Sequence, residues 1–483
     1  MSQFFQMQDL AAIVPEGELV VFAMFLLIFD LLIKDKRWIG VIGLIGIAVS
    51  TGFLLFKVGF NKIPGCCYGG VLVVDSFATL FKLIFLIAAA LSIAISLKYL
   101  DVERENHGEY YALILFATMG MMFMAGAMDL VTLYIGLETM AIATYVLVGF
   151  LKSNQRSNEA SMKYFLLGAF SSGILLYGMS LLYGISGSTK FFDIAEALAR
   201  RPVNDPISLV AMITLSAGML FKIAAVPFHQ WTPDAYEGAP SSITAFMSVA
   251  VKAASFAMMA RVLMIAMGPL QANWTPILAA VSVMTMTVGN IAAITQSNVK
   301  RLLAYSSISH AGYVLIGFIA GNDTGLTAVP LYLLIYTFTN LGVWGIVVAL
   351  RRKDVIGEHI DDMAGLYFRH PTAAILMLIF LLSLAGIPPT AGFIGKYYLF
   401  AAAIETGHNT LAVIAVLNAA ISIYFYFRIV VSMFMREATE KTGLTYAPGL
   451  NIALAIAIVF TLFIGIYPDP FINMARHAVI LGF

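Results

Sequence analysis

The sequence predicts an all-α polytopic membrane protein, and two features carry that prediction. Of the 483 residues, 60% are hydrophobic and only 11% are charged, whereas a soluble domain carries about 25% charged residues. Apolar runs near 20 residues long recur along the whole chain, and a helix of that length crosses the hydrocarbon core of a bilayer. The net charge of +1 offers no basic surface for a nucleic acid.

The apolar runs predict about fourteen transmembrane helices. They cover residues 13–33, 39–58, 76–97, 110–127, 130–150, 161–185, 206–228, 241–266, 275–295, 302–321, 327–350, 372–404, 409–434 and 450–470. The seventh run contains Pro227, and the twelfth is too long for one straight helix and contains Pro388 and Pro389. Because proline removes a helical hydrogen bond, we expect both spans to be discontinuous.

The distribution of Lys and Arg predicts the orientation. With the N-terminus outside, sixteen of these residues fall in inner loops, five in outer segments and seven within the spans. Positive residues accumulate on the cytoplasmic side, so both termini are expected on the outer side. The longest outer loop, residues 187–206, contains FFDIAEALARR, which is typical of a short amphipathic helix at the membrane surface.

The two proline-broken spans also predict internal symmetry. They lie five spans apart and therefore run in opposite directions, as in an inverted repeat of two five-helix units. We expect an N-terminal three-helix segment at residues 1–109, a first repeat of spans 4 to 8 at 110–266, and a second, inverted repeat of spans 9 to 13 at 267–435. Residues 436–483 then hold the C-terminal helix.

Five titratable residues lie deep inside the predicted spans, at Glu138, Lys222, Lys252, His310 and Lys396. A lysine at the centre of a membrane helix costs about 2.5 to 3.5 kcal/mol on insertion scales, so such residues are functional candidates by default. Burial disfavours a charged lysine and a nearby carboxylate favours it, so a lysine facing a glutamate can switch between two charge states. The sequence therefore predicts a proton relay.

A structural explanation stands beside each of these assignments. Lys222, Lys252 and Glu138 could form a buried ion pair with no transport role. His310 could be a polar contact between packed helices. Asp234 and Glu237, in the inner loop WTPDAYEGAP, fit a helix cap better than a proton-collecting entrance. Four residues near span ends are expected to extend their charges to the lipid headgroups, namely Lys57, Lys82, Arg261 and Arg428.

The only two cysteines, Cys66 and Cys67, are adjacent and lie in an outer loop. Adjacent cysteines do not have the spacing that holds an iron–sulfur cluster or zinc. We expect no cofactor and no metal in this chain, so redox chemistry would lie in other chains.

Three long motifs resemble subunit N of the bacterial-type proton-pumping NADH:quinone oxidoreductase, respiratory complex I. They are LFKIAAVPFHQWTPDAYEGAPSSITAFMSVAVKAASF, TQSNVKRLLAYSSISHAGY and LSLAGIPPTAGFIGKYYLF. The resemblance covers essentially the whole chain. The motif WTPDAYEGAP is more similar to subunit N than to the related antiporter-like subunits L and M.

This resemblance implies roles for individual residues. Glu138 matches the glutamate that tunes the lysine of the seventh helix, and Lys222 matches that lysine. Lys252 matches the connecting lysine of the eighth helix, and Lys396 matches the lysine of the twelfth helix that communicates with the outer face.

The resemblance also implies a cellular location and a set of partners. The chain would be a multi-pass protein of the bacterial inner membrane with both termini on the periplasmic side. Its partners would be lipids, a second antiporter-like subunit and small membrane subunits, while flavin, iron–sulfur clusters and quinone would lie in partner subunits. The alternatives are a subunit of a multisubunit sodium/proton antiporter, a membrane-bound hydrogenase-type complex, or a structural spacer with inert ion pairs.

Overall fold

The structure is a computed structural model that describes residues 7–58, 65–351, 357–437, 444 and 447–479. It is almost entirely helical, which confirms the predicted all-α membrane fold. In the described residues, twelve helices are long and apolar enough to cross a membrane. These spans are carried by α1 (Met7–Leu32), α2 (Arg37–Phe53), α3 (Ser76–Glu103), α4 (Gly108–Gly126), α5 (Leu130–Val148), α6 (Gln155–Ser186), the composite helix from Ser241 to Ala266, α12 (Gln271–Ile294), α13 (Val299–Ala320), α14 (Asp323–Leu350), α18 (Asn409–Met435) and α19 (Pro448–Ile466).

Two shorter apolar helices stand where the seventh and twelfth spans are predicted. They are α8 (Pro206–Lys222) and α16 (Pro371–Ala385). The chain leaves α8 at Lys222 and re-forms a helix at α9 (Trp231–Gly238). It leaves α16 at Ala385, turns at Gly386 and continues as α17 (Ala391–Glu405). Pro227 and the Pro388–Pro389 pair lie within these interruptions, and each interruption contains a cis peptide bond before a proline. The count of fourteen and the inverted repeat remain predictions.

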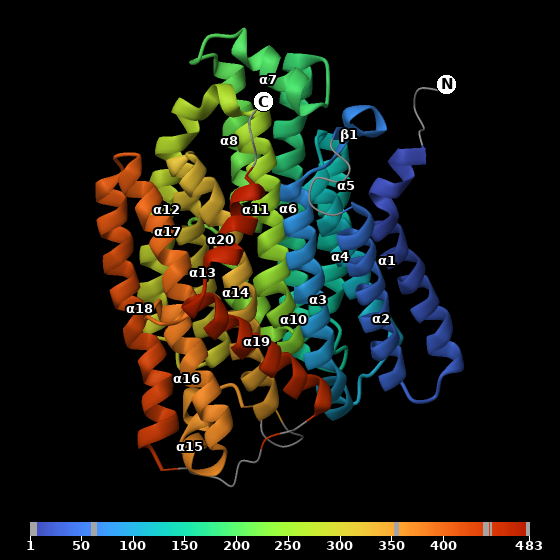
Figure 1. Ribbon diagram of the computed structural model, residues 1–483, viewed down its shortest axis with the longest axis vertical. Helices are drawn as coiled ribbons and strands as arrows, with labels where there is room; N and C mark the ends of the chain where they lie inside the picture. The colour runs from blue at the N-terminus through green and yellow to red at the C-terminus, as the bar shows by residue number, and fades with distance from the viewer. Residues whose placement is uncertain (1–6, 59–64, 352–356, 438–443, 445–446, 480–483) are drawn as a thin grey trace.

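The helices form one bundle around α13 and α14 (Figure 1). Every residue in the apolar window of α14 is buried, and α14 packs against α3, α16, α17 and α19. The N-terminal α1 and α2 flank one side, and α18 flanks the other. The short helix α7 (Phe191–Ala199) lies across one end of the bundle, and α15 (Leu366–Arg369) lies at the opposite end.

Side-chain caps fix the starts of several of these helices. The Asp75 carboxylate accepts a hydrogen bond from the Ala78 amide at 2.7 Å at the start of α3. Asp129 and Asp205 cap α5 and α8 in the same way. These caps satisfy amides that have no partner within their own helix, so polar residues between the apolar runs position the spans.

Some features lie outside the prediction. The composite helix consists of α10 (Ser241–Phe246), a π-helical segment η3 (Met247–Val251), α11 (Lys252–Arg261) and a second π-helical segment η4 (Val262–Ala266). Strands β1 (Gly65–Cys67) and β2 (Leu72–Val74) pair as an antiparallel hairpin. The C-terminal α20 (Asp469–His477) is separated from α19 at Tyr467. Hydropathy alone predicts neither the π-helical segments nor the hairpin nor the separation of α20 from α19.

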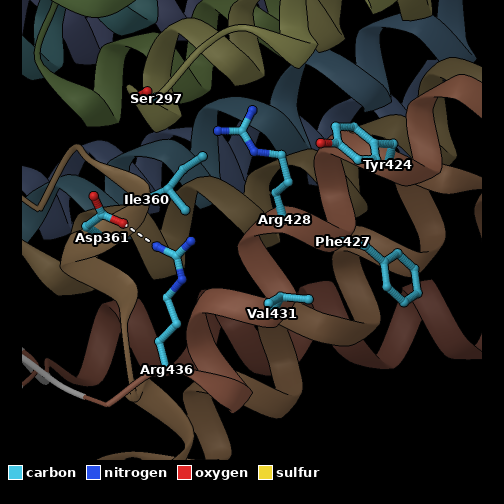
Figure 2. A pocket seen from close by; sticks show the side chains of 8 residues that line it. All are labelled: Ser297, Ile360, Asp361, Tyr424, Phe427, Arg428, Val431 and Arg436. Carbon is cyan, nitrogen blue, oxygen red and sulfur yellow. Dashed lines mark hydrogen bonds and ion pairs between the residues drawn. The ribbon is translucent and has the colours of Figure 1, made fainter.

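The expectation of headgroup-directed charges is wrong for two residues. Lys82 is only 3% exposed and its Nζ lies 2.6 Å from the Glu16 carboxylate. Arg261 is also buried and pairs with Asp75 at 2.7 Å. Arg428, which Figure 2 shows on α18, is half-buried. It donates to the Ile294 carbonyl. The side chain of Lys57 lies outside the described residues.

Candidate functional site

The first group of buried polar residues surrounds Lys222, in the last turn of α8. Its Nζ lies 3.4 Å from the Tyr145 hydroxyl of α5 and 3.3 Å from the Ser172 hydroxyl of α6. The indole of Trp231, just past the break, donates to the Phe221 carbonyl at 3.1 Å. That bond satisfies a carbonyl that the end of α8 leaves free, so the break holds Lys222 in place beside α5 and α6.

Glu138 lies two turns before Tyr145 on α5 and therefore shares its face of the helix. The carboxylate attracts Lys222 at longer range, but the two residues form no direct ion pair. The Glu138 Oε1 atom is buried without a hydrogen-bond partner among the described residues. A direct ion pair between these two residues, the structural alternative, is therefore not what the geometry shows.

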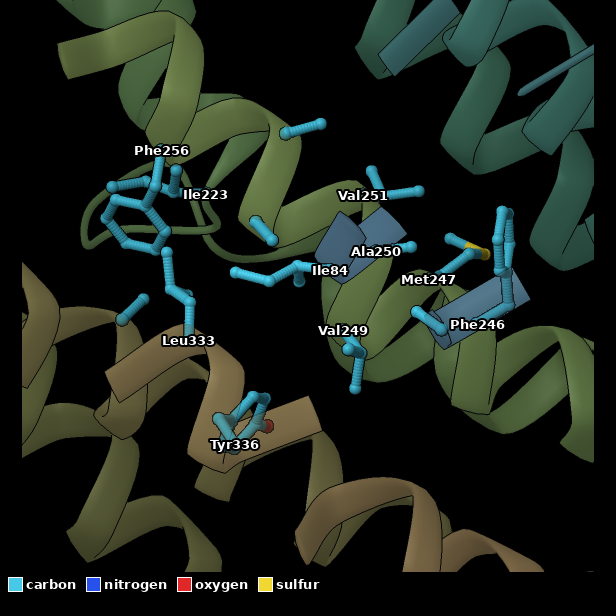
Figure 3. Close-up of a cluster of buried hydrophobic side chains, with 14 of the residues drawn as sticks. Ile84, Ile223, Phe246, Met247, Val249, Ala250, Val251, Phe256, Leu333 and Tyr336 are labelled. Atoms are coloured by element: carbon cyan, nitrogen blue, oxygen red, sulfur yellow. The ribbon is translucent and has the colours of Figure 1, made fainter. Parts of the chain in front are cut away.

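Lys252 lies where the π-helical segment η3 returns to the α-helix. Its buried Nζ donates to the Ser307 carbonyl of α13 at 2.6 Å. Figure 3 shows buried apolar side chains of the composite helix, with Phe256 close to Leu333 of α14. A π-helical segment widens one turn and is frequent at functional sites, and here it directly precedes the lysine. Lys252 is thus a buried basic group whose ammonium donates to a backbone carbonyl.

His310 lies one turn beyond Ser307 on α13 and is held between two tyrosines. Its Nδ1 is 2.6 Å from the Tyr332 hydroxyl and its Nε2 is 3.1 Å from the Tyr426 hydroxyl. The ring is buried and within electrostatic reach of both Lys252 and Lys396. Both ring nitrogens therefore have oxygen partners, as a group that passes protons requires.

Lys396 lies on α17, just after the second break. Its Nζ donates to the last carbonyls of α16, at 3.0 Å to Leu384 and 2.8 Å to Ala385. It also stands 5.0 Å from the centre of the Tyr313 ring of α13. A cation is favoured both at a helix C-terminus and over an aromatic face. A cavity of about 520 Å³ extends from Lys396 to Glu405 at the far end of α17.

One face of α13 connects the second half of this arrangement. Ser307, His310 and Tyr313 are spaced three residues apart and lie on one side of the helix. Lys252 contacts the first of them and Lys396 contacts the third. Lys252 and Lys396 thus contact the two ends of the α13 face that carries His310, whereas Lys222 lies among polar groups of α5 and α6.

A charged network closes the end of the bundle near the first break. Arg301 of α13 binds Asp234 at 2.9 Å and Glu237 at 2.7 Å, and Lys163 of α6 binds Asp234 at 3.1 Å. Burial alone would raise the pKa of Asp234, but the hydrogen bonds from Arg301 and Lys163 outweigh it and hold the pKa below its usual value. The expectation that Asp234 caps a helix is wrong, because α9 has no side-chain cap.

The sequence did not identify two kinds of partner. The pairing of Lys82 with Glu16 joins α3 to α1 across 66 residues of chain, and nothing local marks it. The tyrosines at 145, 332 and 426 hold the relay candidates; tyrosine within an apolar span is the signal that could have found them, since a buried hydroxyl needs a partner. Within the described ranges no group of three His, Cys, Asp or Glu side chains could hold a metal.

A bundle of long apolar helices with two breaks, each followed or preceded by a buried lysine, defines an antiporter-like membrane protein. The family described as NADH:quinone oxidoreductase/Mrp antiporter, TM matches residues 127–422. An NADH-quinone oxidoreductase subunit N from Solibacter usitatus is 52% identical and covers 99% of both chains. One from Koribacter versatilis is also 52% identical and covers 95% of this chain and 93% of its own.

Solved structures agree with these relatives. A chain of respiratory complex I from Thermus thermophilus superimposes with a TM-score of 0.82 and 31% identity, covering 96% of this chain and all of that one. The chain belongs to the family of NADH-quinone oxidoreductase subunit N, as the three sequence motifs predicted.

Proposed function

We propose that this chain moves protons across the bacterial inner membrane as a non-redox subunit of NADH:quinone oxidoreductase. In this proposal quinone reduction in partner subunits changes the electrostatic state of Glu138 and Lys222. Lys222 then passes a proton toward Lys252, and His310 carries it onward to Lys396 and the outer face. Flavin, iron–sulfur clusters and quinone belong to partner subunits, which include a second antiporter-like subunit.

The observation that carries this proposal is the kind of partner that each buried lysine has. Lys222 meets two hydroxyls, Lys252 one carbonyl, and Lys396 two carbonyls and a ring. None of the three is in ion-pair contact with a carboxylate of the described residues. A buried ammonium without such a partner is costly, so no fixed carboxylate ties it to one charge state and its proton can leave.

The second half of the proposed route has a hydrogen-bonded set of polar groups around His310. The Tyr332 and Tyr426 hydroxyls hold both nitrogens of His310, and Tyr426 also bonds Ser306 at 2.5 Å. Hydroxyl groups can both donate and accept, so such a set supports proton transfer along α13. The cavity beside Lys396 supports an exit toward the end of α17 that carries Glu405.

The test replaces Lys252 with Ala in the assembled complex and measures protons released per electron delivered to quinone. We expect release through this subunit to fall about 100-fold or more, the loss usual for a positioned proton-transfer group. Lys152→Ala is the control, because Lys152 is exposed in a loop. An unchanged proton-to-electron ratio in a fully assembled Lys252→Ala complex would rule out this route.

A second variant tests direct transfer. Lys252→Arg keeps the positive charge, but a guanidinium does not release its proton. We expect Lys252→Arg to pump as poorly as Lys252→Ala while the complex assembles normally. Full pumping by Lys252→Arg would show that only the charge at this position matters.

The alternative is a subunit of a sodium/proton antiporter, since the matching family also includes Mrp antiporters. Mass spectrometry of the chains that co-purify with this one separates the two. Redox subunits with flavin and clusters support the first function, and small antiporter subunits alone support the second.

A further inference from the structure

A cavity of about 480 Å³ opens at the end of the bundle that carries α15, away from the lysine route. Its walls are α18, the short helix η6 (Ile360–Met363) and the turn after α12. The lining residues are Ser297, Ile360, Asp361, Tyr424, Phe427, Arg428, Val431 and Arg436 (Figure 2). Two arginines at one cavity mark it as a place for an anion.

Within the part of the chain that the structure describes, each arginine uses only part of its hydrogen-bonding capacity. Arg428 donates through one nitrogen to the Ile294 carbonyl, and Arg436 donates through one nitrogen to Asp361 at 2.6 Å. A guanidinium has five N–H donors in a fixed plane, and that plane matches phosphate oxygens. Both side chains extend from α18 in the same direction in Figure 2, so their remaining donors are available to one ligand.

The α18 wall of the cavity also carries exposed apolar side chains. Tyr424, Phe427 and Val431 are spaced by three and four residues, so they form one outward face of α18. In a membrane-spanning helix such a face contacts acyl chains. Arg428 lies seven residues before the last residue of α18, about 10 Å along the axis, which is the depth at which chains give way to headgroups.

The charges of the cavity favour a phosphodiester. Two arginines and Asp361 give a net charge of +1, which balances the single negative charge of a phospholipid phosphate. Inorganic phosphate, which carries up to two charges and no chains, would leave the apolar wall without a partner.

We propose that this cavity binds an anionic phospholipid of the adjoining leaflet. Its phosphate lies between Arg428 and Arg436, and one acyl chain lies along Tyr424, Phe427 and Val431. This site does not depend on the proton route.

The test uses the purified complex in bilayer discs of phosphatidylcholine that contain a small fraction of phosphatidylglycerol with a photoactivatable acyl chain. Cross-linked peptides are mapped by mass spectrometry. We expect labelling within residues 424–431, suppressed by excess unlabelled phosphatidylglycerol and unaffected by inorganic phosphate. Competition by inorganic phosphate, or equal labelling by a photoactivatable phosphatidylcholine, would overturn the proposal.

The variant Arg428→Gln with Arg436→Gln should lower the labelling by more than about tenfold, because it removes both guanidinium groups and the loss of one charge-assisted hydrogen bond alone costs about tenfold. Lys152→Gln, an exposed basic residue distant from the cavity lining, should label as the unsubstituted complex does. Undiminished labelling of the double variant would refute the site. If the double variant fails to assemble, competition by unlabelled phosphatidylglycerol and by inorganic phosphate on the unsubstituted complex decides whether the site binds an anionic phospholipid.

Discussion

Buried lysines of two kinds occur in this protein, and their partners distinguish them. Lys82 is fixed by the Glu16 carboxylate at 2.6 Å, so its charge is compensated by a direct ion pair. Lys222, Lys252 and Lys396 contact neutral oxygens. The first kind of lysine stabilises helix packing, whereas the second is suited to changing its charge.

Lys82→Met should destabilise the protein by about 3 to 5 kcal/mol, because it leaves Glu16 as an unpaired buried charge. The double variant Glu16→Met with Lys82→Met should recover most of that loss, since apolar residues of similar size replace the pair. Thermal unfolding of the purified complex measures both. Proton-to-electron ratios of assembled Lys82→Met complexes should stay normal, and a fall would place Lys82 in the transport route.

Sequence spacing predicted which residues lie deep in the membrane, but not which of them have partners. Lys222 and Lys252 were identified because charge in an apolar run is conspicuous. Lys82 was misassigned because its carboxylate lies 66 residues away, near the start of α1. The ion pairs of Asp234 span 71 and 67 residues, and pairings over such distances depend on the fold rather than on local pattern.

At the scale of elements, the two broken helices determine the positions of Lys222 and Lys396. At the second break, the Gly392 amide of α17 donates to the Ser383 hydroxyl of α16 at 3.0 Å, and Ser383 also meets Thr339 of α14 at 3.1 Å. A side chain at Gly392 would overlap the Ser383 carbonyl. The half-helices therefore approach closely because residue 392 is glycine, and this contact holds Lys396 at the end of α16.

Gly392→Ala should destabilise the protein by about 1 to 3 kcal/mol, the usual cost of overpacking. It should also slow proton release, because α17 must shift together with Lys396. Gly184→Ala in α6 is the matched control, since a methyl group there meets open space. Melting temperature and proton release measured on the same preparations give the answer, and equal behaviour of the two variants would refute this account of the break.

Proline and hydropathy predicted these breaks, but not the geometry around them. Hydropathy does not predict the π-helical segments before and after α11, because an apolar run is compatible with either helix type. The hairpin of β1 and β2 contains only three residue pairs. Such short strands cannot be recognised in the sequence beside the long apolar spans.

At the scale of the whole molecule, the two predicted repeats are joined by polar contacts as well as by packing. Arg301 connects to Asp234 and Glu237, and the Asn340 amide donates to Ser248 at 2.7 Å. The Lys252 bond to Ser307 belongs to the same set. The groups of the proposed proton route and the groups that join the predicted repeats are thus partly the same residues.

The network at Asp234 gives stability a pH dependence. Because its pKa is lower in the folded protein than in the unfolded chain, its stabilising effect is present above the ordinary aspartate pKa of about 3.9 and is lost as pH falls through the folded value. Asp234→Asn should therefore melt at a lower temperature than the unsubstituted protein at pH 7, and the difference should shrink below about pH 4. Glu109→Gln, at an exposed carboxylate, should show no such gap; a gap that persists at low pH would contradict the assignment.

The complete burial of α14 has a consequence for biosynthesis. Its partners lie on both sides of it in the sequence: α3 is made earlier, while α17 and α19 are made later. Phe338 of α14 stacks on Phe460 of α19 at 4.5 Å, so one of its walls is synthesised only after α14 itself. We therefore expect α14 to lie in lipid until α19 is synthesised, and a chain truncated before α19 to leave Phe338 uncovered on that side.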